Sequence, residues 1–428
     1  MAGEWRAFRL GDVCSKIGSG ATPRGGSSVY LEEGEIALVR SQNVYNDGFH
    51  RDGLVYLTEQ HADELSNVEL AENDILLNIT GDSVARSCQV PLTILPARVN
   101  QHVAIIRTDP TVLWPGFLRY YLVSPAMQAE MLSLAGAGAT RNALTKGMVE
   151  SFQVFAPVDV AEQRAIAHIL GALDDKIELN RRMNATLEAM ARALFKSWFV
   201  DFDPVRAKLA LSGAEGMAGR DTGLPAEIAD LFPDGFEELA VEDVPKGWRV
   251  KTNGELFELA YGKALKEGNR RPGHVPVYGS NGQVGWHDEK LVSGPGIVVG
   301  RKGNPGIVTW APTDFFPIDT AFYVIPKEPC CSLHFLFYAL QTQDLASLGA
   351  DSAVPGLNRN IAYMNKQVVP PPDIMKHFDQ QARSIFLRIH QSDEQSRTLA
   401  ALRDALLPKL ISGAVRVGDA ARFVGEFV

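Results

Sequence analysis

The sequence has few cysteines and lacks a long apolar run. Its 428 residues contain four cysteines, at positions 14, 88, 330 and 331, and none of them form a Cys-x-x-Cys pair. Adjacent cysteines rarely bridge, so this usage favours a reducing compartment. No apolar run approaches the ~18–20 residues of a membrane span, and the first residues lack the apolar core of a signal peptide. We therefore expect a cytoplasmic protein that folds without disulfides.

The sequence also lacks the common catalytic motifs. It has no Gly-x-x-x-x-Gly-Lys-Ser/Thr, Gly-x-Gly-x-x-Gly, His-Glu-x-x-His or Gly-x-Ser-x-Gly. The Asn/Asp-Pro-Pro-aromatic signature of amino methyltransferases is missing too, and the nine histidines have no metal-ligand spacing. We therefore expect no enzymatic activity, no cofactor and no bound metal.

The sequence also lacks the strong excess of basic over acidic residues that is typical of a protein that binds nucleic acid by itself. The net charge is −9. The acidic residues are concentrated in 158–245, whereas 246–372 carry a small excess of basic residues. A local basic face can attract phosphates, but a partner would have to supply part of the affinity for DNA.

The chain does contain a loose two-fold repeat. Thr186–Phe195 and Thr398–Leu407 are identical at five of ten positions. Each half opens with Trp-Arg and runs through a β-rich stretch, a helix and a proline-terminated strand. Such a repeat gives one polypeptide two similar binding surfaces, which suits a target with two half-sites.

The predicted fold is mixed α/β (α+β), with two repeated domains separated by two long helices that form an antiparallel coiled coil. Short apolar runs bounded by polar residues predict strands in each repeat, and Asn281-Gly282 is a type I′ turn signal. The predicted segments are a first domain at 1–157, a long helix at 158–203, a linker at 204–245, a second domain at 246–372, and a second long helix with a tail at 373–428.

Apolar residues at alternating spacings of three and four predict the seam between the two helices. Polar residues in the middle of both seams favour pairing in a fixed register, and Pro408 predicts an end or kink. The residues expected to pair the helices are Leu170, Leu173, Ile177, Asn180, Asn184, Leu187, Leu194, Ile385, Ile389, Ser392, Ser396, Leu399 and Leu406.

Polar loops in each half are candidate nucleic-acid contacts. Asn78–Arg86 follows a predicted strand and could reach a phosphate or a base edge, or it could be an ordinary turn closed by its own side chains. Asn100-Gln101 could read adenine, although such residues more often satisfy loop backbone. Gly300–Gly306 places two cations in a glycine-rich turn, which could contact DNA or be a solvated hairpin tip. Arg and Asn recur in 139–145 and 354–361, at equivalent places in the two repeats.

These loops and their neighbours supply the full set of candidate DNA-binding residues. In the first half they are Arg24, Arg40, Gln42, Asn43, Thr80, Ser83, Arg86, Asn100, Gln101, Arg141 and Asn142. In the second half they are Lys263, Lys266, Arg270, Arg271, Asn281, Arg301, Lys302, Asn304, Asn358 and Arg359.

The sequence resembles the specificity (S) subunits of type I restriction–modification systems over nearly its whole length. The most specific segments are Asp175–Asn184 running to Phe195–Pro204, Gly223–Pro233 and Leu406–Gly413, and Pro276–Gly282 with Val299–Gly303 looks like the family's target-recognition pattern. The resemblance implies two target recognition domains that each read half of a split, asymmetric site in double-stranded DNA. It also implies helices that act as spacer and dock two modification (methyltransferase) subunits, joined by restriction (translocase–endonuclease) subunits.

Two other functions stay open at this level. A fused methyltransferase or nuclease specificity module is opposed by the missing motifs. A tandem-domain adaptor that binds proteins and no nucleic acid is favoured by the acidic balance and disfavoured by the basic, glycine-rich loops of the second repeat.

Overall fold

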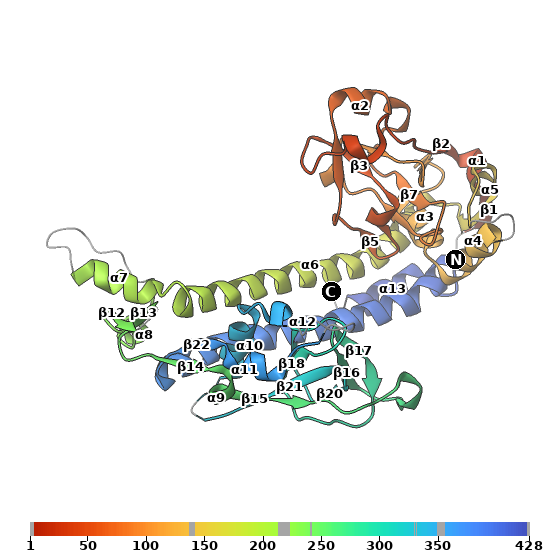
Figure 1. Ribbon diagram of the computed structural model, residues 1–428. Helices are drawn as coiled ribbons and strands as arrows, with labels where there is room; N and C mark the ends of the chain where they lie inside the picture. Colours follow the sequence, from red (N-terminus) through yellow and green to blue (C-terminus); the bar gives the residue numbers. More distant parts are fainter. Residues whose placement is uncertain are drawn as a thin grey trace. The chain divides into compact units, whose positions relative to one another are not determined.

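A computed structural model describes residues 4–136, 142–212, 223–239, 242–328, 330, 332–348 and 356–425 (Figure 1). The chain divides into two compact units. The first is formed by 1–180 and 395–428, and the second by 181–394. Each unit therefore contains one β-rich half together with parts of both long helices.

Two small sheets form the β-rich part of the first unit. A four-stranded antiparallel sheet has the order β2-β10-β7-β8, and a three-stranded sheet, β6-β3-β9, pairs β3 with β9 in parallel. A separate pair, β1-β11, joins the two ends of this half. The strands are β1 (Trp5–Arg9), β2 (Cys14–Ser19), β3 (Ile36–Val39), β6 (Val55–Leu57), β7 (Ile75–Asn78), β8 (Ser87–Gln89), β9 (Ala97–Val99), β10 (Val103–Thr108) and β11 (Gln153–Pro157).

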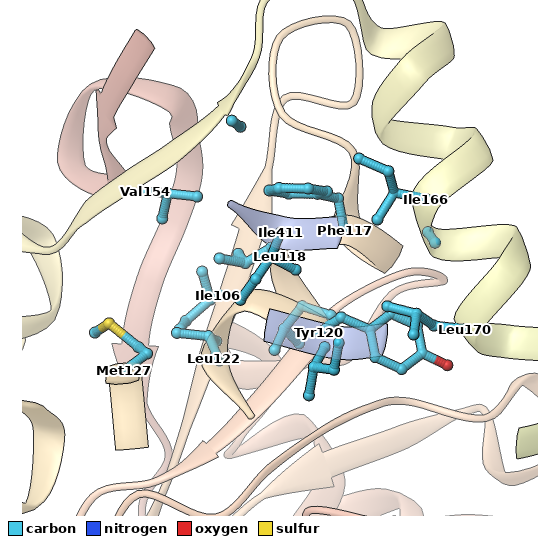
Figure 2. Close-up of a cluster of buried hydrophobic side chains, with 14 of the residues drawn as sticks. Ile106, Phe117, Leu118, Tyr120, Leu122, Met127, Val154, Ile166, Leu170 and Ile411 are labelled. Atoms are coloured by element: carbon cyan, nitrogen blue, oxygen red, sulfur yellow. The ribbon is translucent and has the colours of Figure 1, made fainter. Parts of the chain in front are cut away.

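Helices cover the first unit's sheet and bury its main core. Figure 2 shows Phe117, Leu118, Tyr120 and Leu122 lying among Ile106 of β10, Ile166 and Leu170 of α6, and Ile411 of α12. Every one of these side chains is almost fully buried, at the apolar spacing expected of helices packed on a sheet. The helices are α3 (Pro115–Leu122), α4 (Pro125–Gly136), α5 (Lys146–Ser151), α6 (Val160–Phe199), α12 (Pro372–Ile411) and α13 (Val417–Val424).

The second unit repeats the topology of these sheets, but the short hairpin β4 (Val44–Tyr45)–β5 (Gly48–Phe49) of the first unit has no counterpart between β16 and β17. Its four-stranded sheet has the order β15-β21-β18-β19, and β17-β16-β20 pairs β16 with β20 in parallel. Strand pair β14-β22 corresponds to β1-β11. The elements are β14 (Arg249–Thr252), β15 (Phe257–Tyr261), β16 (Val275–Gly279), β17 (Gly282–His287), β18 (Gly296–Gly300), β19 (Val308–Ala311), β20 (Phe316–Pro317), β21 (Ala321–Pro326), β22 (Lys366–Val369), α9 (Asn253–Leu256), α10 (Leu333–Gln341) and α11 (Arg359–Met364).

The two long helices pair antiparallel in each unit. In the first unit, Nδ2 of Asn180 donates to Oε1 of Gln395 at 2.9 Å and to Oγ of Ser396 at 3.2 Å. In the second, Nδ2 of Asn184 donates to Oδ1 of Asp393 at 2.7 Å. These buried amides fix the register, because a shift by one turn would leave them without partners. The predicted seam residues are buried or partly buried.

The segment 204–245, predicted as a linker, contains ordered elements: α7 (Asp203–Ser212), α8 (Ala226–Ala229) and the hairpin β12 (Phe236–Leu239)–β13 (Glu242–Pro245). Phe202 and Phe232 pack against the indole of Trp248 there, so apolar burial organises the segment.

Pro408 does not end α12, which continues to Ile411, and a kink at this position stays a prediction. Pro408 has no amide hydrogen, so the carbonyl of Asp404 loses the intrahelical bond that it would otherwise accept, three residues before the helix ends. The hairpin at 279–282 is present, but its turn is not type I′. Gly279 pairs with Gly282, Gly282 takes φ +94°, and Asn281 is not among the described non-glycine residues with positive φ.

Candidate nucleic-acid interface

The predicted polar loops of the first half meet at one edge of the β-structure. The pairs Val103–Asn78, Ala104–Ser19 and Val99–Val39 place the ends of β7, β2, β3 and β9 beside the start of β10. The loops that follow or precede these strands carry Arg24, Arg40, Gln42, Thr80, Ser83, Arg86, Asn100 and Gln101. Strand register, which no local motif specifies, brings them together.

A chain of hydrogen bonds joins three of these loops. Oγ1 of Thr22 donates to Oε1 of Gln101 at 2.6 Å, and Nε2 of Gln101 lies 3.0 Å from Nε2 of His102. Nδ1 of His102 lies 2.6 Å from Oγ1 of Thr80. Because an amide nitrogen can only donate, neutral His102 carries its proton on Nδ1 and donates it to Thr80. Thr22 and His102 were not predicted from the sequence.

A stack of cationic and aromatic groups lies on and beside the β4–β5 hairpin of the first unit. The guanidinium carbon of Arg86 lies 4.6 Å from the ring centroid of Tyr45. The rings of Tyr45 and His50 are stacked with centroids 4.2 Å apart. Such contacts fix a guanidinium in place while leaving its donors free for an anionic partner.

Some predicted contacts are used inside the protein. Asn43 is fully buried, and its Nδ2 donates to the carbonyls of His50 and Asp52. Asn100 is 6% exposed, and its Oδ1 accepts from the amide of His102. Both amides hold loop backbone, so we leave these two residues out of the proposed contacts. Arg141 lies outside the described residues, whereas Asn142 is described and its carbonyl accepts from the amide of Gly81.

The equivalent edge of the second unit gathers its loops in the same way. Tyr261 pairs with Phe322, Gly300 with Ala321, and Gly279 with Gly282. The loops beyond these pairs carry exposed Lys263, Asn281, Lys302 and Asn304, and partly buried Arg301. Nδ2 of Asn304 donates to Oδ1 of Asn281, joining two of the loops.

The two guanidiniums of this edge flank one ring. The Cζ atoms of Arg301 and Arg359 lie 4.7 and 5.0 Å from the ring centroid of Tyr261. Neighbouring Asn358 caps α11, because its Oδ1 accepts from the amides of Asn360 and Ile361. We therefore leave Asn358 out of the proposed contacts as well.

The basic cluster at 263–271 does not form a single patch. Lys266 is exposed, while Arg270 donates to the carbonyl of Val284 at 2.6 Å. Arg271 lies near the Val275–His287 end of the β16–β17 hairpin, opposite Asn281, and pairs with Asp288 and Glu289 at 2.7 Å each. Its hydrogen bond lowers the pKa of the Asp288 carboxyl. Two carboxylates neutralise Arg271, so we leave it out of the proposed contacts.

A separate hollow of about 340 Å³ in the second unit lies against α12, lined by Trp310, His334, Asp379 and Phe386. Nδ1 of His334 lies 2.8 Å from Oδ1 of Asp379, so these two groups of the lining bind each other. The described residues contain no cluster of three potential metal ligands, and none of the described helices is long and apolar enough to span a bilayer.

Comparison with known proteins identifies the family of this chain. A family model described as the type I restriction modification DNA specificity domain matches residues 2–189 and 245–389. The chain belongs to this family of specificity subunits. The two matched ranges contain both β-rich halves, most of α6 and the N-terminal part of α12, so the family pattern is itself repeated.

Individual specificity subunits are similar to this chain over almost its full length. The HindI specificity subunit of Haemophilus influenzae is 26% identical, covering 96% of this chain and 100% of the relative. The MjaIX specificity subunit of Methanocaldococcus jannaschii is 22% identical, with coverage of 97% and 94%. The crystal structure of an S subunit from M. genitalium has a TM-score of 0.61 at 17% identity, with coverage of 95% and 96%, which shows that this specificity subunit shares its fold.

Proposed function

We propose that this specificity subunit reads a bipartite, asymmetric site in double-stranded DNA, one half-site per unit, as the non-catalytic subunit of a type I restriction–modification complex. The supporting observation is the pair of equivalent loop edges. Both have the same strand order, and each carries a different set of polar and cationic side chains. One scaffold with two side-chain sets suits two different half-sites.

The proposed partners are two modification (methyltransferase) subunits, joined by restriction (translocase–endonuclease) subunits. The acidic net charge of −9 supports shared binding, because counter-ion release by a few cations gives limited affinity. The long helices are the proposed docking surface. Leu179, Met190 and Leu387 leave apolar side chains exposed on them, at 58%, 55% and 52%.

The direct test is DNA binding with and without the modification subunit. We expect the purified chain alone to bind DNA weakly and to show no methyl transfer or cleavage. Addition of the modification subunit should give site-specific binding and methylation. Methyl transfer or cleavage by the isolated chain would support the fused-enzyme alternative, and a complex with no affinity for DNA would support the adaptor.

The helices are also the proposed ruler for the spacer between half-sites. Seven residues inserted after Asn180 and seven after Glu394 keep both hydrogen bonds of Asn180 in register. Each helix lengthens by about 10 Å, equivalent to roughly three base pairs. Three additional base pairs rotate one half-site relative to the other by about 100°, and we expect this rotation to lower activity.

The readout is the set of sites methylated by the lengthened subunit, with sites carrying a spacer three pairs longer expected among them. A stable, active variant that still modifies only the original spacing would exclude the ruler.

A further inference from the structure

Tyr261 is an exposed aromatic residue at the end of β15 in the second unit, and the proposed DNA contacts did not include it. The residue is 51% exposed. It sits directly opposite Phe322 of β21, which is 1% exposed, with ring centroids 5.0 Å apart. An exposed ring is thus seated on a buried one, and a cross-strand aromatic pair of this kind holds both side chains in place.

Two arginines from distant parts of the sequence contact this ring. Arg301 follows β18, and Arg359 is the first residue of α11. Their Cζ atoms lie 4.7 and 5.0 Å from the Tyr261 centroid, within the range of a favourable cation–π contact. Each guanidinium also has a second ring beside it, Phe322 for Arg301 and Tyr363 for Arg359.

Backbone carbonyls complete the positioning of both guanidiniums. Nη1 of Arg301 donates to the carbonyl of Asp319 at 3.1 Å, and Nη1 of Arg359 donates to that of Leu259 at 3.3 Å. Within the described part of the chain neither guanidinium has an ion-pair partner, unlike Arg271. Each therefore keeps its full charge and most of its five donors for an external anion.

We propose that Tyr261 is a positioning residue that holds Arg301 and Arg359 as one preorganised contact to the phosphate backbone of the half-site bound by the second unit. This inference rests on the proposed function. Two cations fixed beside one ring lose little side-chain entropy on binding. Phosphate contacts of this kind set the register of a protein on the duplex, while other side chains read the bases.

The first unit has no such assembly at the matching positions. There the register pairs Ser19 with Ala104, and Leu144 donates to the carbonyl of Ile79 as Leu357 does to that of Arg301. Tyr261, Arg301 and Arg359 thus correspond to Ser19, Ile79 and Lys146. Nζ of Lys146 lies 3.5 Å from Oε1 of Glu150. At these matching positions, the contact is present in the second unit and not in the first.

The experiment measures affinity of the complex with the modification subunit for its cognate duplex and for a scrambled duplex, over a series of salt concentrations. Tyr261→Leu should weaken cognate binding about tenfold and reduce the salt slope, whereas Tyr261→Phe, which keeps the ring, should stay near wild type. Arg301→Met with Arg359→Met should reduce the slope by about two. Tyr261→Leu added to that pair should cost little more, because the three groups act as a unit.

Lys290→Met is the charge-matched control. Lys290 pairs with Asp314 at 2.7 Å and precedes the start of β18, at the end of that strand opposite Arg301. Its loss should leave the slope unchanged. Wild-type affinity for Tyr261→Leu, or a loss confined to one base position without a change of slope, would overturn the inference. A wild-type complex that does not distinguish cognate from scrambled DNA would instead contradict the proposed function.

Discussion

The two units have the same backbone at their loop edges and different chemistry on it. Leu144 donates to the carbonyl of Ile79 at 2.8 Å, and Leu357 donates to that of Arg301 at 2.9 Å. Near the first of these bonds, His102 takes part in a chain of side-chain hydrogen bonds and Arg86 stacks on the ring of Tyr45. Around the second lie two guanidiniums on Tyr261. Main-chain bonds preserve the scaffold without constraining the side chains, so each edge can carry its own specificity.

The packing of the long helices shows the same contrast inside each unit. In the first unit Asp174 of α6 accepts from Arg119 and Tyr120 of α3 and from Arg403 of α12. At the matching place in the second unit, Phe386 of α12 packs against Phe337 of α10, with ring centroids 5.6 Å apart. One helix contact is thus ionic in one unit and aromatic in the other, and the repeat keeps the fold without keeping the interactions that stabilise it.

The largest expected effect comes from breaking the ionic version of this contact. Asp174→Ala leaves two partly buried guanidiniums without their shared carboxylate, and it should destabilise the first unit by about 3 kcal/mol. Chemical denaturation of the chain, with hydrogen exchange to locate the loss, measures this. Asp404→Ala removes an exposed carboxylate from the same Arg403, and its cost should stay under about 1 kcal/mol. If the two substitutions reduced stability equally, the burial of Asp174 would make no difference to the strength of its ion pairs.

The next effect separates the two edges. Arg86→Ala and Arg301→Ala should each cost about 1–3 kcal/mol in DNA binding if a base is read, or reduce the salt slope if a phosphate is contacted. The loss should map to a different half-site for each variant. Binding to duplexes with one half-site scrambled makes the assignment, and loss in the same half-site for both would contradict the assignment of one half-site to each unit.

A smaller effect concerns Asp379 of α12. The corresponding helix contact of the first unit has no acidic group that matches it. Burial acts to raise the pKa of its carboxyl, but hydrogen bonds from His334 and Ser332 outweigh this, and the pKa is lowered. A lowered carboxyl pKa contributes stability above the unfolded pKa near 4, and this stability is lost as the pH falls through the folded value. Asp379→Asn should therefore cost about 1 kcal/mol at pH 7 and progressively less below pH 4. Unfolding free energies between pH 3 and 7 test this, and a cost that does not vary with pH would contradict it.

The smallest effect tests the C-terminal end of α12, where the helix dipole is negative. Lys409→Ala near the C-terminus of the helix removes a favourable interaction with the helix dipole. We expect a loss of a few tenths of a kcal/mol, measured by thermal unfolding at low salt and absent at high salt.

The fold could be predicted from the sequence where local pattern is strong. The 3,4 spacing through Leu170, Leu173 and Ile177 gave the long helices and their seam, and the apolar runs gave β3, β7 and β10. The packing of the segment 204–245 could not be predicted, because it depends on aromatic contacts with Trp248 that no local pattern encodes.

The candidate interface was predictable only in part, for the same physical reason. Sequence indicates which residues can contact DNA but not whether their donors are free. Asn43 and Gln42 have the same chemistry, yet Asn43 is buried with its Nδ2 on two carbonyls, whereas Gln42 is exposed and its Nε2 donates to the carbonyl of Gly53. Arg301 and Arg359 are brought together by strand register and by the bond from Leu357, and Tyr261 between them had no sequence signal beyond its aromatic ring.

The most direct test maps methylated sites in cells that express the modification subunit with this chain, or with a chimera whose residues 1–157 come from another specificity subunit. Two units with equivalent backbones and independent side-chain chemistry predict a bipartite, asymmetric site, of which the chimera changes one half and keeps the other. A site that changes in both halves, or in neither, would contradict the independence of the two units.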